Sequence, residues 1–149
     1  MISAIVAAVH VLALAIGLPS VFLRGRALAG PLDAERLRRL FAADNVWGIA
    51  AALWIVTGLL RAFGGLEKGA PFYLSSRLFW TKLGLFGLVF ALEIWPMVTF
   101  IRWRRQLRNG HAPDTSRAAV LHRLNHLELV LVVVIVFVAS LMARGFGQR

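Results

Sequence analysis

The chain has 149 residues, of which 59% are hydrophobic and 16% charged, whereas a soluble domain has roughly 45–50% and about 25%, so one membrane-embedded domain over residues 1–149 is expected. The absence of cysteine excludes disulfides, iron–sulfur clusters and thioether-linked haem. The formal net charge of +10 does not indicate nucleic-acid binding, because the arginines lie mostly at the ends of apolar segments, where they set topology and attract anionic lipid.

The first apolar run, residues 2–23, predicts a membrane-spanning helix. It is too long for the core of a signal peptide and is followed by Arg24 and Arg26, so we interpret it as a retained span. Polar or small residues recur every seven positions and therefore share one helix face: Ser3, His10 and Gly17.

The next predicted helix, residues 32–43, is amphipathic and is expected to lie at the membrane interface, with its arginines toward water or lipid phosphate. The second span follows over residues 44–63 and begins with the polar pair Asp44-Asn45. Its small residues form a ridge suited to close contact with another helix: Gly48, Ala51, Ala52 and Ile55. Segment 64–77 is rich in glycine and is expected to be a loop.

The third span, residues 78–101, carries a lysine and a glutamate. At about 3.6 residues per turn, Lys82, Phe86, Val89 and Glu93 share one stripe. An ionised side chain in a bilayer costs roughly 2.5–3.5 kcal/mol, so this stripe is expected to face the bundle interior or a ligand. Two interpretations of the Lys82 side chain stay open: it contacts a ligand carboxylate, or it snorkels to the membrane interface. Glu93 has three interpretations: pairing with a group on another helix, a catalytic role as a proton carrier, or a protonated structural glutamate.

The last helix is expected to begin at an N-cap on Asp114 or Thr115 and to span the membrane over residues 129–143. His122 and His126 stand at the i, i+4 spacing of two metal ligands on one helix face. The alternative, which we favour, is a polar cluster that joins the second and last spans.

Basic residues predict the orientation of the chain. Eleven arginines lie in the first and third connectors, against five basic residues in the second connector and the C-terminal tail. The positive-inside rule then predicts a multi-pass protein of the bacterial inner membrane with both termini in the periplasm. On this topology four polar residues gather near the inner face: Asp44, Asn125, His126 and Glu128.

His10 is the one ionisable side chain within an otherwise apolar span. In lipid, both nitrogens of its neutral imidazole need partners, which favours a hydrogen bond to a neighbouring helix. Histidine is also a common axial ligand of haem iron, and Lys82 at a comparable depth would suit a haem propionate. Both alternatives stay open on spacing alone.

Three stretches resemble a known family: His10 in the first span, Trp80-Thr81-Lys82-Leu83, and Arg123-Leu124-Asn125. They resemble the HemJ-type protoporphyrinogen oxidases and the wider group that includes the CopD-type copper-resistance membrane domains. Two further stretches, Asp44-Asn45-Val46-Trp47-Gly48 and residues 79–96, resemble another family. Over nearly its full length the chain is similar to this family of predicted bacterial inner-membrane proteins of unknown function. The HemJ resemblance implies a small helical protein that binds haem b, with His10 and Lys82 as key residues.

We therefore predict an all-α integral membrane four-helix bundle with a short amphipathic connector helix. The leading functional hypothesis is haem b binding in a redox role, in which His10 ligates the iron and Lys82 contacts a carboxylate. The alternative is a non-enzymatic accessory or structural subunit, in a homo-oligomer or a larger membrane complex, or a copper-handling protein. Bilayer lipid and a porphyrin-type molecule are the expected partners, and whether the protein is an enzyme stays open.

Overall fold

The computed structural model describes residues 1–147, and this part of the chain is helical apart from short connections and turns. Its helices are α1 (Ile2–Leu28), α2 (Ala34–Phe63), α3 (Ala70–Ser75), α4 (Arg77–Arg108) and α5 (Ala118–Ala143). Each helix except the short α3 is long and apolar enough to cross a bilayer. The predicted all-helical fold with four spans and a short connector helix is thus confirmed.

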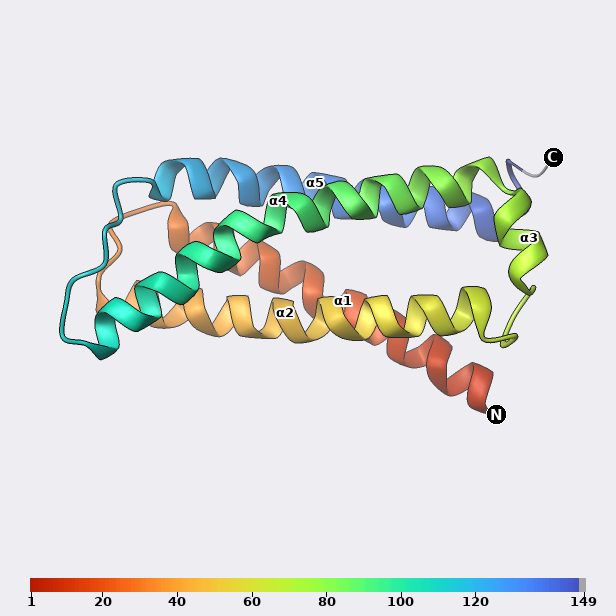
Figure 1. Cartoon of the computed structure of the whole chain (residues 1–149), viewed down its shortest axis with the longest axis horizontal. Coiled ribbons are helices and arrows are strands. Elements are labelled where there is room, and N and C mark those ends of the chain that lie inside the picture. The colour runs from red at the N-terminus through yellow and green to blue at the C-terminus, as the bar shows by residue number, and fades with distance from the viewer. Residues whose placement is uncertain (148–149) are drawn as a thin grey trace.

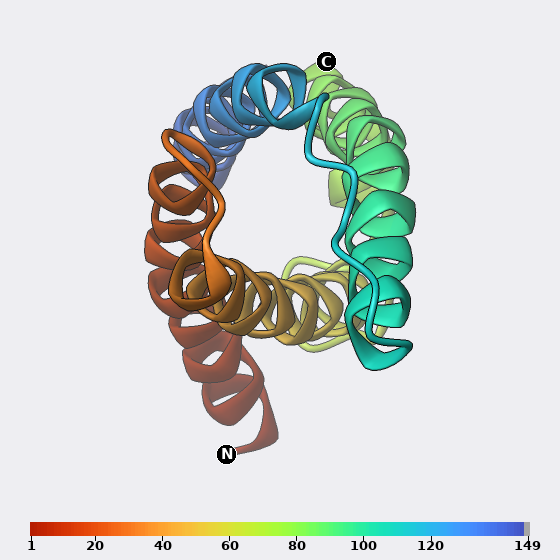
Figure 2. The same ribbon diagram turned by 90° about the vertical axis from the view of Figure 1, so that its left-hand side faces the viewer.

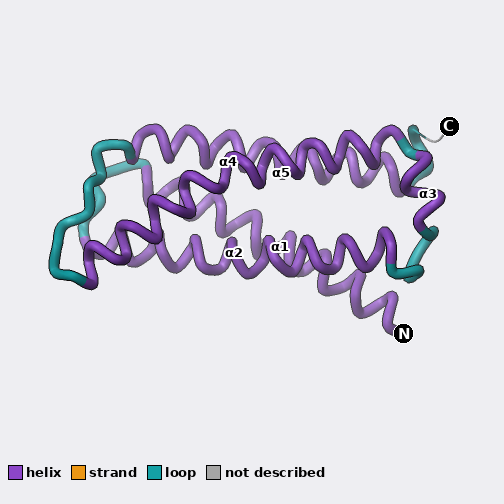
Figure 3. The backbone as a smooth tube through the Cα atoms, viewed as in Figure 1, coloured by secondary structure: helices purple, strands orange, loops and turns teal. Residues whose placement is uncertain are grey.

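The four long helices run along one axis, and the connections lie at the two ends of the bundle (Figures 1 and 3). In the end-on view they form a ring (Figure 2). Helix α1 packs on α2, and α5 packs on both α1 and α4, whereas the backbones of α2 and α4 stay apart over most of their length. Large apolar side chains such as Ile49 and Phe137, which are 65% and 67% exposed, cover the outside and suit a lipid environment.

Close packing between α1 and α2 depends on small residues of α1. A Cβ atom at Gly17 would lie 3.1 Å from Cβ of Ala50 and 3.3 Å from the Trp47 ring, so a larger side chain has no room there. The ridge predicted on α2 lies only partly against another helix, since Ala51 packs against the buried cluster around Val21 and Val132. Gly48 faces open space and, with Ala51, lines a groove between α2 and α4. The sequence shows that the ridge exists but not which neighbour it faces.

The predicted interfacial helix over residues 32–43 is not a separate element but the first part of α2. Asp33 caps this helix, since its carboxylate accepts a 2.8 Å hydrogen bond from the backbone N–H of Arg36. No glycine or proline interrupts the junction with the second span. The short connector helix is instead α3, in the segment expected to be a loop, and Pro71 stands at its start, where a missing N–H costs little.

The last helix also begins later than predicted. Its first residue is Ala118, and Arg117 occupies the N-cap position. The carboxylate of Asp114 accepts a 3.0 Å hydrogen bond from the backbone N–H of Ser116, so this side chain holds a turn before the helix.

Candidate functional site

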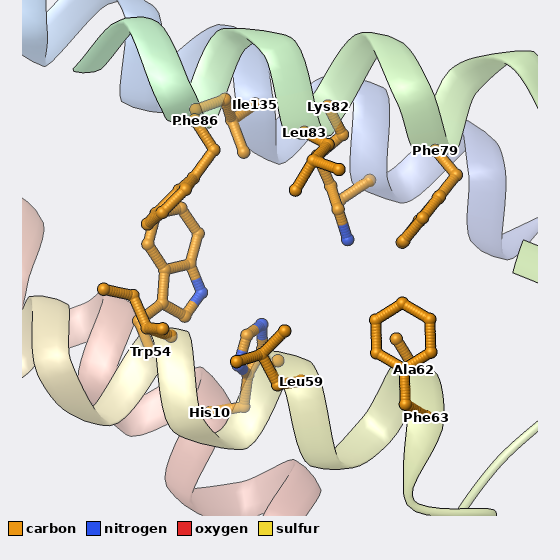
Figure 4. Close-up of a pocket in the computed structure, with 13 residues that line it drawn as sticks. His10, Trp54, Leu59, Ala62, Phe63, Phe79, Lys82, Leu83, Phe86 and Ile135 are labelled. Carbon is orange, nitrogen blue, oxygen red and sulfur yellow. The ribbon is translucent and has the colours of Figure 1, made fainter. Parts of the chain in front are cut away.

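His10 and Lys82 line the same pocket, at the end of the bundle that carries α3 (Figure 4). The pocket has a volume of about 140 Å³, and residues from all four long helices line it. Apart from these two side chains its lining is predominantly apolar. The Lys82 amine points into the space on the opposite side from the imidazole. The prediction that the Lys82 stripe faces the bundle interior is therefore confirmed for this residue.

A neighbouring helix holds the His10 ring in place. Nδ1 of His10 lies 2.8 Å from Oγ1 of Thr57 on α2, which confirms the predicted hydrogen bond between helices. The Thr57 hydroxyl donates its own proton to the backbone carbonyl of Leu53 at 2.6 Å. The threonine oxygen is therefore an acceptor toward His10, and Nδ1 carries the imidazole proton. This leaves Nε2 deprotonated, with a lone pair available for a ligand.

Aromatic side chains form one wall beside this imidazole. The ring centroids of His10 and Trp54 are 5.8 Å apart, and those of Trp54 and Phe86 are 6.0 Å apart. The imidazole lies against α2 at Gly58, where a Cβ atom would be 3.4 Å from Cε1 of His10, about van der Waals contact. The wall thus offers flat apolar surfaces next to a free ring nitrogen.

A smaller pocket of about 130 Å³ shares His10 and Lys82 with the first and is more polar. Its carboxylate, Glu67, is paired with Arg61 at 2.6 Å and accepts a 2.7 Å hydrogen bond from the Tyr73 hydroxyl. Burial raises the pKa of Glu67, but the Tyr73 and Arg61 bonds outweigh it and hold that pKa below its usual range. With Lys68 also in the lining, the pocket has three cations against one carboxylate, an environment suited to an anionic ligand.

Glu93 does not line the pocket of His10 and Lys82. Its two carboxylate oxygens accept hydrogen bonds from Nη1 and Nη2 of Arg24 on α1, at 2.6 and 2.8 Å. Trp47 adds an N–H bond of 3.2 Å to Oε2. Of the three interpretations of Glu93, pairing with a group on another helix is the one that these hydrogen bonds support.

Arg24 is fully buried and joins all four long helices. Besides Glu93 it donates to Asn125, Glu128 and Asp44, at 2.7, 2.5 and 3.2 Å. Of the four polar residues predicted to gather, Asp44, Asn125 and Glu128 contact Arg24, whereas His126 does not. The sequence assigns Arg24 itself to the connector after the first span, so the residue that joins the others was not predicted. Its signal was present in the sequence, since Arg24 continues the seven-residue series of Ser3, His10 and Gly17.

The Arg24 cluster contains more carboxyl than guanidinium groups. Arg104 supplies the second guanidinium and donates to Asp44 at 2.8 Å, so two cations face the carboxyl groups of Asp44, Glu93 and Glu128. Oε1 of Glu128 is buried and has no hydrogen-bond partner among residues 1–147. The cluster ties the helices together at the end of the bundle remote from α3.

The two histidines of α5 stay outside this cluster. The rings of His122 and His126 are 4.3 Å apart, and Nδ1 of His126 lies 3.0 Å from the backbone carbonyl of His122. In the part of the chain that the structure describes, no group of three or more His, Cys, Asp or Glu side chains could hold a metal ion. A metal site on this pair therefore lacks its third ligand.

A family model described as "Predicted membrane protein (DUF2214)" matches residues 2–147 of the chain. No curated protein and no solved structure matches the chain. The description agrees with the four candidate spans of the structure.

Proposed function

The chain belongs to this family of predicted membrane proteins, and we propose that it binds haem b at the pocket of His10 and Lys82, in a redox role like that of HemJ-type proteins. The hydrogen bond between His10 and Thr57 carries the proposal. A haem iron takes a neutral imidazole nitrogen, and a bond on the other ring nitrogen fixes the tautomer and the ring orientation. Nε2 of His10 is that free nitrogen.

The charges around the pocket suit the two carboxylates of haem b. Lys82 lies between the apolar pocket and the polar one, and Arg61 and Lys68 line the polar one. Of these cations, only Arg61 is paired with a carboxylate among the described residues. Lys82 would bind one propionate and Lys68 the other, while the apolar lining would receive the macrocycle.

The space available sets a condition on this proposal. Small-molecule sites usually have about 300–1,000 Å³, more than the 140 Å³ of the pocket. Trp54 and Phe86 also line a groove of about 600 Å³ between α2 and α4. Haem binding therefore requires these two aromatic side chains to rotate and join the pocket to the groove. The separation of the α2 and α4 backbones favours this rearrangement.

Haem and protein would have different roles at this site. Bound haem supplies one-electron chemistry, and the protein supplies binding, orientation and exclusion of water. His10 would hold the iron, Lys82 would orient the macrocycle through a carboxylate, and the aromatic wall would shield it. Glu93 lies in the Arg24 cluster, so the proposal gives it no part in holding the haem.

The absorption spectrum of the full-length protein, purified in detergent from haem-supplied cells, tests the proposal. We expect a Soret band that is lost in His10→Ala and retained in the matched control His122→Ala, which removes a histidine from α5. A colourless wild-type protein, or a band that persists in His10→Ala, contradicts haem ligation by His10. A colourless protein that co-purifies with a stoichiometric partner would support the accessory-subunit alternative.

Copper handling is the second candidate. Met142 lines the polar pocket together with His10, and a thioether with an imidazole suits Cu(I). Titration of the haem-free protein with Cu(I) and with haem, in wild type and Met142→Leu, separates the two. Copper binding lost in Met142→Leu supports the copper function, whereas haem binding is expected to survive this substitution.

A further inference from the structure

A basic pocket lies at the other end of the bundle, between the last turns of α1 and the first turns of α2. Its volume is about 580 Å³. Arg26, Arg36 and Arg39 line it, and none of the described residues in its lining is acidic. It shares no lining residue with the site of His10 and Lys82, so its occupancy does not depend on haem binding.

Two of these arginines have unneutralised charge. Arg39 donates a 2.8 Å hydrogen bond to Glu35, an exposed pair on the same helix. Arg26 and Arg36 form no ion pair with any residue between 1 and 147. Guanidinium groups bind phosphate oxygens with two parallel hydrogen bonds, so an unpaired pair of them in one pocket favours a phosphate ligand.

The Arg36 guanidinium lies close to the connection between the two helices. A Cβ atom built on Gly30 would clash with Nη1 of Arg36 and would lie 2.8 Å from its Cζ. The guanidinium therefore lies directly on the backbone of this connection, where a larger residue would displace it. In this position the charge of Arg36 lines the pocket.

The remaining lining of the pocket is largely apolar. It includes Leu23 and Val46, which are 57% and 40% exposed on helices that span the membrane. A free phosphate ion would use only the arginines. A phospholipid uses both parts, because its phosphate meets the cations at the end of the spans while an acyl chain runs along the apolar residues.

We propose that this pocket binds an anionic phospholipid, with the headgroup phosphate on Arg26 and Arg36 and an acyl chain along Leu23 and Val46. Basic pockets between membrane-spanning helices are an established way to recognise anionic headgroups. The pocket would select lipids by net headgroup charge, since a zwitterionic lipid brings its own cation to the arginines.

Native mass spectrometry of the full chain, exchanged with phosphatidylglycerol or phosphatidylcholine, measures this selectivity. We expect retention of phosphatidylglycerol over phosphatidylcholine in wild type, and about a tenfold loss of phosphatidylglycerol affinity in Arg26→Gln/Arg36→Gln. The matched control is Arg102→Gln/Arg105→Gln, which removes the same charge from exposed positions of α4 at the same end of the bundle.

Gly30→Ala provides a second variant that retains every charge. It displaces the Arg36 guanidinium and is expected to weaken phosphatidylglycerol binding, while circular dichroism shows an unchanged helix content. Three results would overturn the proposal: equal binding of the two lipids, an equal loss in the Arg102/Arg105 control, or full competition by millimolar inorganic phosphate. The last result would assign the site to the free anion.

Discussion

Arg24 on α1 and Glu93 on α4 form a two-pronged ion pair, with Nη1 and Nη2 of the guanidinium 2.6 and 2.8 Å from the two carboxylate oxygens. The backbones of these two helices do not pack against each other, so the pair crosses the interior of the bundle. Arg24 is fully buried, and water therefore cannot replace a lost partner. The pair is central to the stability of the fold, whereas the pocket of His10 and Lys82 is central to its proposed function.

Arg24→Ala is expected to destabilise the protein by about 3–5 kcal/mol, because it leaves buried carboxylates without their cation. Thermal unfolding in detergent, followed by circular dichroism, measures the change. Arg102→Ala on the exposed face of α4 is the control and should stay within about 0.5 kcal/mol of wild type. Equal effects of the two substitutions would show that the Arg24 cluster does not hold the helices together.

The two glutamates of this cluster should differ in their tolerance of amidation. Glu93→Gln replaces one acceptor of the two-pronged pair by a donor that faces Arg24, with an expected cost of about 1.5–3 kcal/mol. Glu128→Gln keeps an oxygen for Arg24 and balances two carboxylates against two guanidinium groups, so its expected cost is below about 1 kcal/mol. The same unfolding assay tests this order, and the reverse order contradicts it.

Thr57→Val removes the acceptor that holds Nδ1–H of His10 while preserving the shape of the side chain. If His10 ligates haem, the affinity should fall about 10–100-fold, the usual effect of losing a partner of a ligating histidine. Haem titration followed at the Soret band measures it. Thr99→Val is the matched control, because the Thr99 hydroxyl bonds the carbonyl of Trp95 on its own helix. An unchanged haem affinity in Thr57→Val would contradict the proposal that the His10–Thr57 hydrogen bond orients His10 for haem ligation.

The role of Lys82 is tested with haem and its dimethyl ester, in which both carboxylates are blocked. Wild type should bind haem more tightly than the ester, because the cations around the two pockets attract the free carboxylates. Lys82→Met should abolish most of the difference in affinity between haem and its ester, and should leave the affinity for the ester nearly unchanged. A difference as large as in wild type would place the carboxylates away from Lys82.

The shifted pKa values of Tyr73 and Glu67, near α3, predict how the stability of the protein depends on pH. Burial and the Glu67 carboxylate raise the pKa of Tyr73 from 10.0 to about 12, so its contribution is present below pH 10 and is lost as the pH rises toward about 12. The lowered pKa of Glu67 gives a contribution that is present above its unfolded pKa of about 4.3 and is lost as the pH falls below it.

Tyr73→Phe tests both limbs in one series of unfolding measurements against pH. The difference in stability between wild type and variant should be largest at neutral pH and should shrink between pH 10 and about 12. It should also shrink in acid, because a protonated Glu67 no longer accepts a charge-assisted bond from Tyr73. A difference that is constant with pH contradicts the coupling of these two groups.

The sequence by itself determined the four spans and the inward stripe of the third. Long apolar runs are visible in one dimension because each segment must separately satisfy the bilayer. The inward direction of Lys82 and Glu93 is also predictable from their own segment, because the cost of charge in lipid forces these side chains inward wherever their neighbours lie. The gathering of Asp44, Asn125 and Glu128 also followed from the chain, because residues near one membrane face share a depth.

Only the tertiary structure decided which residues meet. It placed Arg24 at the centre of the carboxylates, joined residues 32–43 to the second span, and turned Gly48 toward a groove instead of a helix. It also supplied Thr57 as the partner of His10, from a helix that sequence spacing could not relate to the first. The physical reason is that depth and helix face are periodic properties of one segment, whereas a hydrogen bond between helices depends on their rotation and separation, which arise only when all four pack together.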